Sequence, residues 1–271
     1  DRFGAHRSTM ITLKNSFHGR TVTTLAATGQ DVFHQYFDPF TDGFCHVPAN
    51  DIAALVGVLD NSVCAVMMEL VQGEGGVLPL DREYVVAVAK LCKERDLLLI
   101  IDEVQTGMGR CGTLFAYQSY GITPDVVTTA KGIGGGLPLG AVLATKTCSE
   151  TLSPGTHATT FGANPICSAA ANAVLDVLED GVLDAVNEKG AYLRAAIETM
   201  GYPTRGMGLM IGIQVEPGTH KATVAKLVEA GLLCITAGND AIRLLPPLTI
   251  TKEEMDAGLE ILKQVLSGGA A

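Results

Sequence analysis

Short apolar or β-branched runs alternate with a helix-length amphipathic stretch along the first part of the chain. Three of these runs, Val63–Leu70, Leu97–Ile101 and Asp125–Thr129, predict buried strands. Between the first two, apolar side chains recur at helical spacing from Asp81, the expected N-cap, to about Arg95. This alternation is typical of a mostly parallel sheet flanked by helices, so the pattern predicts an α/β fold.

The pattern changes near residue 180. Ala141–Ala144 predicts a further strand, and an Ala-rich helix is expected over Asn164–Glu179, with Gly181 as its stop signal. We expect a large domain over residues 1–180 and a small C-terminal α+β domain over residues 181–271. The elements expected in the small domain are a helix at Leu183–Met200, a strand at Leu209–Val215, a helix at Ala222–Ala230, a strand at Ile242–Leu245 and a helix from Lys252.

The formal net charge is −10, and 47% of the residues are hydrophobic. Nucleic acid and anionic membrane surfaces repel an acidic chain, so neither is expected as a partner. No apolar run approaches the roughly 18 residues that a membrane span needs, and the start of the chain has no secretory signal pattern. The composition is typical of a soluble enzyme, which we expect in the cytoplasm.

Seven cysteines are dispersed along the chain without a C-x-x-C pair. Such a set is typical of reduced thiols in a cytosolic protein, so no disulfide framework is expected. The six histidines form no H-E-x-x-H motif and none stands at ligand spacing from a cysteine. We therefore expect no metal site.

Two charged residues follow predicted strands, where open α/β sheets carry their ligand sites. Asp102 comes directly after Leu97–Ile101. A carboxylate at the end of a buried strand needs a cationic partner, although a helix cap or a structural ion pair would also explain it. Lys131 stands in Thr128–Gly140, TTAKGIGGGLPLG, whose glycines allow the backbone to pass close to a ligand.

The glycines around Lys131 leave more than one chemistry open. A lysine in a glycine loop can bind phosphate, but G-x-x-x-x-G-K-[ST] is absent from the sequence, which argues against a P-loop. A lysine in an apolar pocket can instead act as a Schiff-base amine, because desolvation favours its neutral form. Gly107–Gly112 reads G-x-G-x-x-G, but it does not directly follow the strand, so nicotinamide binding is a remote alternative.

Six motif-like segments follow one another along the chain: Phe17–Arg20, Glu69–Gly76, Leu99–Arg110, Thr128–Gly140, Gly155–Pro165 and Ile242–Ile250. Taken together, these motifs resemble the class III aminotransferases, and most of all their acetylornithine and ornithine aminotransferase group. The resemblance runs over essentially the whole chain, with motifs in the family order. It implies the fold-type I architecture of pyridoxal-phosphate-dependent transferases.

The resemblance implies specific contacts with pyridoxal 5′-phosphate. Lys131 would hold the cofactor covalently and carry the proton during catalysis. Asp102 would keep the pyridine nitrogen protonated, so that the ring can accept carbanion charge. From the residues alone, a phenylalanine such as Phe17 is more often simple core packing. The remaining implied cofactor contacts are Phe17, Glu103, Val104, Gln105 and, from a second subunit, Thr160.

The resemblance also implies how substrates are bound. Arg20 would bind the α-carboxylate, since a guanidinium fork suits that group. Glu74 and Arg243 would form a movable pair that opens when glutamate or 2-oxoglutarate enters, although the residues alone suggest only surface charges. Thr159 would contact substrate beside Thr160, and the active sites of a homodimer would be shared. From the residues alone, both threonines belong to an ordinary turn before a helix.

The implied reaction moves the terminal amino group of N2-acetylornithine to 2-oxoglutarate by a ping-pong mechanism, as a step of arginine biosynthesis. Ornithine, succinylornithine and 4-aminobutyrate are alternative donors, because the residues that line the distal pocket in the family largely precede Asp1. An inactive fragment is the alternative of a different class.

Two departures from the family pattern bear on that alternative. Family members carry an earlier segment with a Gly-Ser/Thr-x-Ala turn whose amides bind the cofactor phosphate. That turn is absent from the sequence, and the first residue is not Met, so we expect the chain to be part of a longer protein. The smaller departure is Leu70, where relatives commonly have proline.

Overall fold

The computed structural model describes residues 6–149 and 151–268. Its main sheet has six strands in the order β2-β1-β3-β6-β7-β8, all parallel to their neighbours except the edge strand β8. The predicted α/β class is therefore confirmed. The strands are β1 (Thr9–Leu13), β2 (Phe44–Val47), β3 (Val63–Met68), β6 (Leu98–Asp102), β7 (Val126–Thr129) and β8 (Ala141–Ala144).

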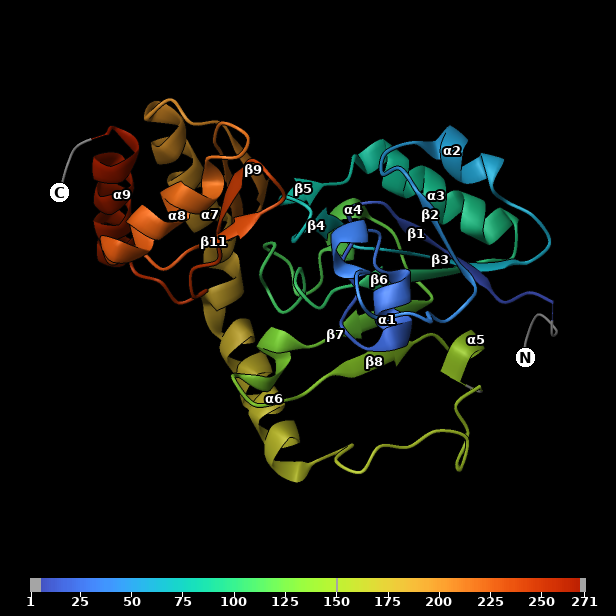
Figure 1. Cartoon of the computed structure of the whole chain (residues 1–271). Coiled ribbons are helices and arrows are strands. Elements are labelled where there is room, and N and C mark those ends of the chain that lie inside the picture. The colour runs from blue at the N-terminus through green and yellow to red at the C-terminus, as the bar shows by residue number, and fades with distance from the viewer. Residues whose placement is uncertain (1–5, 150, 269–271) are drawn as a thin grey trace.

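Helix α3 (Arg82–Glu94) packs on β6, and α2 (Ile52–Gly57) lies beside it on the same side of the sheet (Figure 1). Val85, Val88 and Cys92 of α3 are buried there, as their helical spacing predicted, whereas Ala89 of the same predicted face is only partly buried. Asp81 is the N-cap by position, but its side chain accepts no cap hydrogen bond. The smaller elements of this part are α1 (Val22–Ala27), η1 (Asp31–Phe33), β4 (Val71–Gln72), β5 (Leu78–Pro79), α4 (Tyr117–Tyr120), η2 (Lys131–Gly134) and α5 (Lys146–Ser149).

A second, antiparallel sheet follows in the C-terminal part, with strand order β11-β12-β10-β9. Ile211, Ile213 and Ile242 face a second hydrophobic cluster, which α7, α8 and α9 complete. The elements are α7 (Leu183–Thr199), β9 (Thr204–Met207), β10 (Met210–Gln214), α8 (His220–Glu229), β11 (Ile235–Ala237), β12 (Ala241–Leu244) and α9 (Lys252–Leu266).

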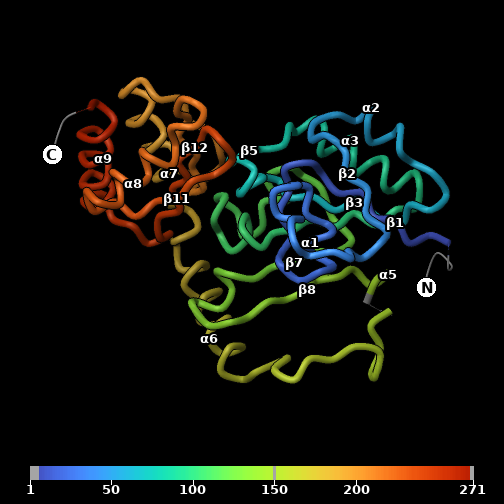
Figure 2. Tube along the Cα trace, viewed as in Figure 1, coloured from blue at the N-terminus to red at the C-terminus, as the bar shows by residue number. Residues whose placement is uncertain are grey.

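A kinked helical connection joins the two parts. Helix α6 (Pro165–Val177) begins at Asn164, whose side chain accepts the amides of Ile166 and Cys167. It runs through η3 (Leu178–Val182) into α7, and Figure 2 shows this path leading from beside the six-stranded sheet to the small one. Asp180 and Gly181, the latter with φ of 85°, have non-helical backbone conformations, so the first helix ends at this kink and Gly181 is the stop signal that the sequence predicted. This kink supports the predicted division near residue 180, which we retain as a proposal.

The expected elements occur with shifts of a few residues at their ends. The strand predicted over Val63–Leu70 stops at Met68, because Glu69 leaves the ladder and accepts hydrogen bonds from two loops. Within the described residues, no helix is long and apolar enough to cross a membrane. In the same residues, no cluster of three or more potential ligand side chains could hold a metal ion.

Candidate active site

Three parallel strands bring the candidate residues to one edge of the large sheet. Strands β3, β6 and β7 are consecutive neighbours and run in the same direction. Their carboxyl ends are followed by Glu69, closed by Asp102 and followed by Lys131, respectively. The carboxyl edge of such a sheet is the usual place for a ligand site.

Asp102 is buried, with an exposed fraction of 5%, and has a specific partner. The Nδ1 atom of His18 lies 2.8 Å from Oδ2, and the Val104 amide donates to Oδ1 at 3.0 Å. The His18 side chain is fully buried, and its Nε2 atom has no hydrogen-bond partner among the described residues. A turn amide and a histidine ring therefore bind the same carboxylate.

Lys131 opens η2 with a backbone φ of 47°, a left-handed conformation that non-glycine residues rarely adopt. Such a conformation costs about 1–3 kcal/mol and is concentrated at functional sites. Lys131 lines a cavity of about 740 Å³ with the apolar side chains of Met108, Leu178 and Leu248. Lys131 itself is exposed, however, so the described residues do not provide the full desolvation that the sequence argument assumed.

Phe17 and Arg20 form an aromatic and cationic cluster with Phe33. The rings of Phe17 and Phe33 meet edge to face, with centroids 5.4 Å apart. The Arg20 guanidinium carbon lies 4.4 Å from the Phe33 ring centroid and 5.3 Å from that of Phe17. Cation–π contact holds the guanidinium in place while leaving its N–H groups available to a carboxylate.

Glu74 and Arg243 touch, although 169 positions separate them in the sequence. The NH2 group of Arg243 donates to Oε1 of Glu74 at 2.8 Å, and NH1 donates to Oε1 of Gln105 at 2.8 Å. Arg243 is buried, whereas the Glu74 side chain is 31% exposed. The predicted pair therefore exists, and its role in catalysis stays a prediction.

The other predicted site residues lie in three different parts of the structure. Val104 lines the same cavity as Lys131. Glu103 is buried and accepts hydrogen bonds from the Thr106 hydroxyl and the Tyr117 amide, so its carboxylate braces the loop; the cofactor contact predicted for it remains a prediction. Thr159 and Thr160 lie between α5 and α6 in a segment whose residues 151–163 are all exposed (Figure 1).

The glycines of Gly107–Gly112 serve packing. A Cβ atom on Gly112 would lie 2.0 Å from Oδ1 of Asn187, and one on Gly109 would lie 3.0 Å from the Leu248 side chain. Arg110, within the motif, donates to the carbonyl oxygens of Leu209 and Pro246. The segment thus joins the large sheet to the C-terminal part, and it does not connect a strand directly to a helix as a dinucleotide site would.

With this geometry in hand, comparison with known proteins places the chain. Residues 2–266 match the family model described as aminotransferase class-III. The chain belongs to the class III aminotransferases. It is 51% identical to the acetylornithine aminotransferase of Haemophilus ducreyi over 98% of this chain and 69% of that protein. It is 44% identical to the acetylornithine aminotransferase of Bacillus subtilis, over 98% of this chain and 70% of that protein.

Solved structures agree with this assignment of the class III fold. An ornithine aminotransferase from Toxoplasma gondii, with partially occupied PLP, matches with a TM-score of 0.92 and 31% identity. The match covers 98% of this chain and 66% of the Toxoplasma gondii protein. N-acetylornithine aminotransferase from Stenotrophomonas maltophilia matches with a TM-score of 0.83 and 33% identity, over 98% of this chain and 68% of that one. This class III chain thus spans about two thirds of the length of its relatives.

The side chains at this edge of the sheet fit pyridoxal phosphate, the cofactor that the class III family implies. A buried carboxylate, Asp102, is held in place by His18 at the end of β6, which suits a pyridine nitrogen. Lys131 offers an amine beside Val104 and Gln105 in one cavity. Asp102 would suit the pyridine ring of the cofactor, and the Lys131 amine would suit its aldehyde carbon.

The sequence motifs did not predict that His18 and Glu69 lie at the candidate site of this class III aminotransferase. His18 stands within the quoted Phe17–Arg20 motif, but a lone histidine gives no sign of its partner. Glu69 opens the Glu69–Gly76 motif, and it directly follows the predicted buried run, as Asp102 follows its own. A carboxylate directly after a predicted buried strand is therefore a pattern that predicts a site residue, and it applies to Glu69 as it does to Asp102.

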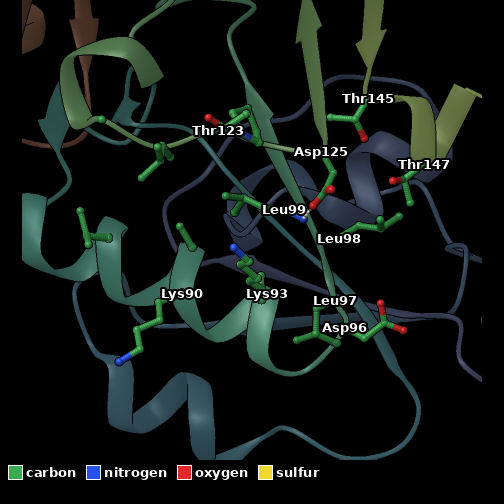
Figure 3. Close-up of a pocket in the computed structure, with 16 residues that line it drawn as sticks. Lys90, Lys93, Asp96, Leu97, Leu98, Leu99, Thr123, Asp125, Thr145 and Thr147 are labelled. Atoms are coloured by element: carbon green, nitrogen blue, oxygen red, sulfur yellow. Dashed lines mark hydrogen bonds between the residues drawn. The ribbon is translucent and has the colours of Figure 1, made fainter.

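A second cavity of the class III chain, of about 650 Å³, lies at the opposite ends of the strands (Figure 3). It is lined by Leu97–Leu99 at the start of β6, by Asp125 before β7 and by Thr145 after the antiparallel β8. Asp125 accepts the Leu99 amide at 2.9 Å and closes this edge. None of the predicted site residues lines it, so it is separate from the candidate active site.

Proposed function

We propose that this chain carries most of the active site of a pyridoxal-phosphate-dependent enzyme that transfers the terminal amino group of N2-acetylornithine to 2-oxoglutarate. The observation that carries the proposal is the unequal state of two arginines. Arg243 is paired with Glu74, whereas Arg20 forms no ion pair within the described residues. A permanently available arginine and a masked one suit substrates that alternate between one carboxylate and two.

The residues around the ring have distinct roles in this proposal. Pyridoxal phosphate, when bound, supplies an electron sink for the carbanion of the amino acid. Asp102 would hold the proton on the ring nitrogen, and His18, 2.8 Å from Oδ2, would orient that carboxylate. The Nζ amine of Lys131 would accept and return the proton of the substrate carbon. Gln105 would hydrogen-bond near the phenolic oxygen, and Phe17 and Val104 would pack against the ring.

Acetylornithine is proposed as donor because of the relatives. Six acetylornithine aminotransferases among the curated relatives are 41–51% identical to this chain. Among the solved structures the two kinds are about equally similar, at 31–33% for acetylornithine and 31–32% for ornithine aminotransferases. Ornithine is the second candidate, supported by a TM-score of 0.92 to an ornithine aminotransferase. Such an enzyme would act in arginine biosynthesis in the cytoplasm.

The experiment is a panel of ω-amino donors assayed with 2-oxoglutarate, using the holoenzyme. Acetylornithine should give the highest kcat/KM among acetylornithine, ornithine, succinylornithine and 4-aminobutyrate. A higher value with ornithine would reassign the donor. The absence of a visible absorption band from bound cofactor, together with no turnover, would identify an inactive protein instead.

We further propose a homodimer whose two active sites are shared. The exposed segment that holds Thr159 and Thr160 supports this, because Phe161 and Ile166 beside them expose 81% and 71% of their surfaces. Large apolar side chains gathered on one segment are typical of an interface. Mixing Lys131→Ala subunits with Thr160→Ala subunits should restore activity, since each mixed dimer contains one intact site. Mixtures no more active than the separate variants would exclude shared sites.

A further inference from the structure

Glu69 is a buried carboxylate outside the set of residues used above. Its exposed fraction is 3%, and its hydrogen bonds come from two backbone amides. The Phe17 amide donates to Oε1 at 2.8 Å, and the Gly73 amide donates to Oε2 at 3.4 Å. An ionisable group is seldom buried in this way without a cationic hydrogen-bond partner, so its retention calls for a reason.

The two amides belong to two segments that carry substrate-binding residues. Phe17 precedes Arg20, and Gly73 precedes Glu74. The segments also meet where the Gln72 side chain donates to the Lys14 carbonyl at 2.9 Å. Among the described contacts between them, Glu69 is the one that holds the backbone of Phe17 itself.

The second segment also contacts Gln105, the side chain that binds Arg243. A Cβ atom on Gly73 would lie 2.2 Å from Oε1 of Gln105, so the backbone of Gly73 packs against that side chain. The same Oε1 atom accepts a hydrogen bond from Arg243. A continuous set of contacts therefore runs from the Phe17 amide through Glu69 and Gly73 to the arginine pair.

We propose that Glu69 is a positioning residue that sets the spacing between Arg20 and the Glu74–Arg243 pair, and thereby selects dicarboxylates by chain length. The proposal rests on the proposed function, in which both arginines bind 2-oxoglutarate. A monocarboxylate amino donor uses Arg20 alone, so it is insensitive to this spacing. A dicarboxylate of five carbons requires both arginines at one separation.

The test uses the holoenzyme with three 2-oxo diacids of four, five and six carbons: oxaloacetate, 2-oxoglutarate and 2-oxoadipate. Glu69→Gln keeps the size of the side chain but presents an N–H group to one of the two amides. The preference for 2-oxoglutarate, as a ratio of kcat/KM values, should fall roughly tenfold, which matches the loss of one buried hydrogen bond. The rate of the half-reaction with the amino donor should change much less.

Two further variants complete the design. Glu69→Asp keeps the carboxyl group but is one methylene too short to reach both amides, so it should show the same loss of preference. It carries the test if Glu69→Gln does not fold, and a ratio measured on one preparation is independent of the active fraction. Asp125→Asn is the matched control, because it alters a carboxylate that accepts one backbone amide at the opposite sheet edge. Its preference should equal that of the wild type.

The outcomes separate the two proposals. An unchanged preference in both Glu69 variants would overturn the positioning role, and so would equal losses with every acceptor and donor. A wild-type enzyme that does not transaminate 2-oxoglutarate would instead remove the proposed function, whatever the Glu69 variants do.

Discussion

Replacing either member of the Glu74–Arg243 pair should damage one half-reaction more than the other. Arg243→Ala removes the group that would bind the second carboxylate of 2-oxoglutarate. Glu74→Gln leaves that arginine in place, still bound to Gln105, but without its charged partner. We expect the first change to impair the 2-oxoglutarate half-reaction and the second to impair the donor half-reaction.

The size of the effect follows from the burial of the two side chains. Arg243 has 4% of its side chain exposed and Glu74 has 31%, so the pair lies between a surface ion pair and a buried one. A hydrogen bond to a charged group contributes about 1.5–3 kcal/mol, which corresponds to roughly 10- to 150-fold in rate. Arg243→Ala should therefore slow the 2-oxoglutarate half-reaction by that factor and the donor half-reaction by about threefold or less.

Single-turnover measurements of each half-reaction provide the assay, because they separate the two substrates. Asp256→Asn is the control: it alters the Lys252–Asp256 ion pair on α9, at 2.6 Å, whose other partner is Tyr192. Equal losses in both half-reactions for both Arg243→Ala and Glu74→Gln would refute the reasoning and reduce the pair to a structural contact.

Three further predictions address the ring and its supports. Lys131→Ala should abolish turnover while circular dichroism shows an intact fold; near wild-type activity would contradict the role of Lys131. Asp102→Asn should lower kcat by about two orders of magnitude, or roughly 2.7 kcal/mol in the barrier, and an unchanged kcat with normal cofactor content would leave Asp102 a structural residue. Burial raises the pKa of Glu69 to about 7; the nearby Asp102 also raises it, while His18 lowers it. The folded state therefore retains a proton that the unfolded chain loses near its ordinary value of 4.5, so wild-type stability should fall by up to about 3 kcal/mol as pH rises through this window. Urea unfolding at pH 5 and pH 8 should show this loss in the wild type and not in Glu69→Gln; identical pH dependence in both would exclude it.

The strand-end residues could be predicted from the sequence because the signal for them is local. Asp102 and Lys131 stand beside short apolar or β-branched runs, and the runs themselves define the strands. The expected strand at Ala141–Ala144 has those same bounds in the structure, and β6 and β7 differ from expectation by one residue at one or both ends. Periodicity and strand propensity therefore fixed the edge of the sheet on which the candidate site lies.

The contacts between those residues could not be predicted, because they are made across the chain. His18 and Asp102 are 84 positions apart, and Phe17 and Glu69 are 52 apart. Neither pair has a spacing that any local pattern encodes, and each depends on the order of β1, β3 and β6 in the sheet. The left-handed backbone of Lys131 is equally invisible, since a lysine does not favour that conformation.

The way the Glu74–Arg243 pair is anchored has a consequence for speed. The backbone at and just after Glu74 is held in place: the Gly238 amide donates to the Glu74 carbonyl at 2.9 Å, and the Arg205 side chain donates to the Gly76 carbonyl at 2.6 Å. With Arg243 buried and held by Gln105, the Glu74 side chain is the part that can move, by rotation about its own bonds. Such rotations take picoseconds to nanoseconds in exposed side chains, and breaking the partly buried pair would slow them by the roughly 10- to 150-fold given above. Opening is then still far faster than the roughly 1–1000 turnovers per second that are typical of enzymes. Opening the pair would therefore never limit turnover, and a slow step in this enzyme must be sought elsewhere.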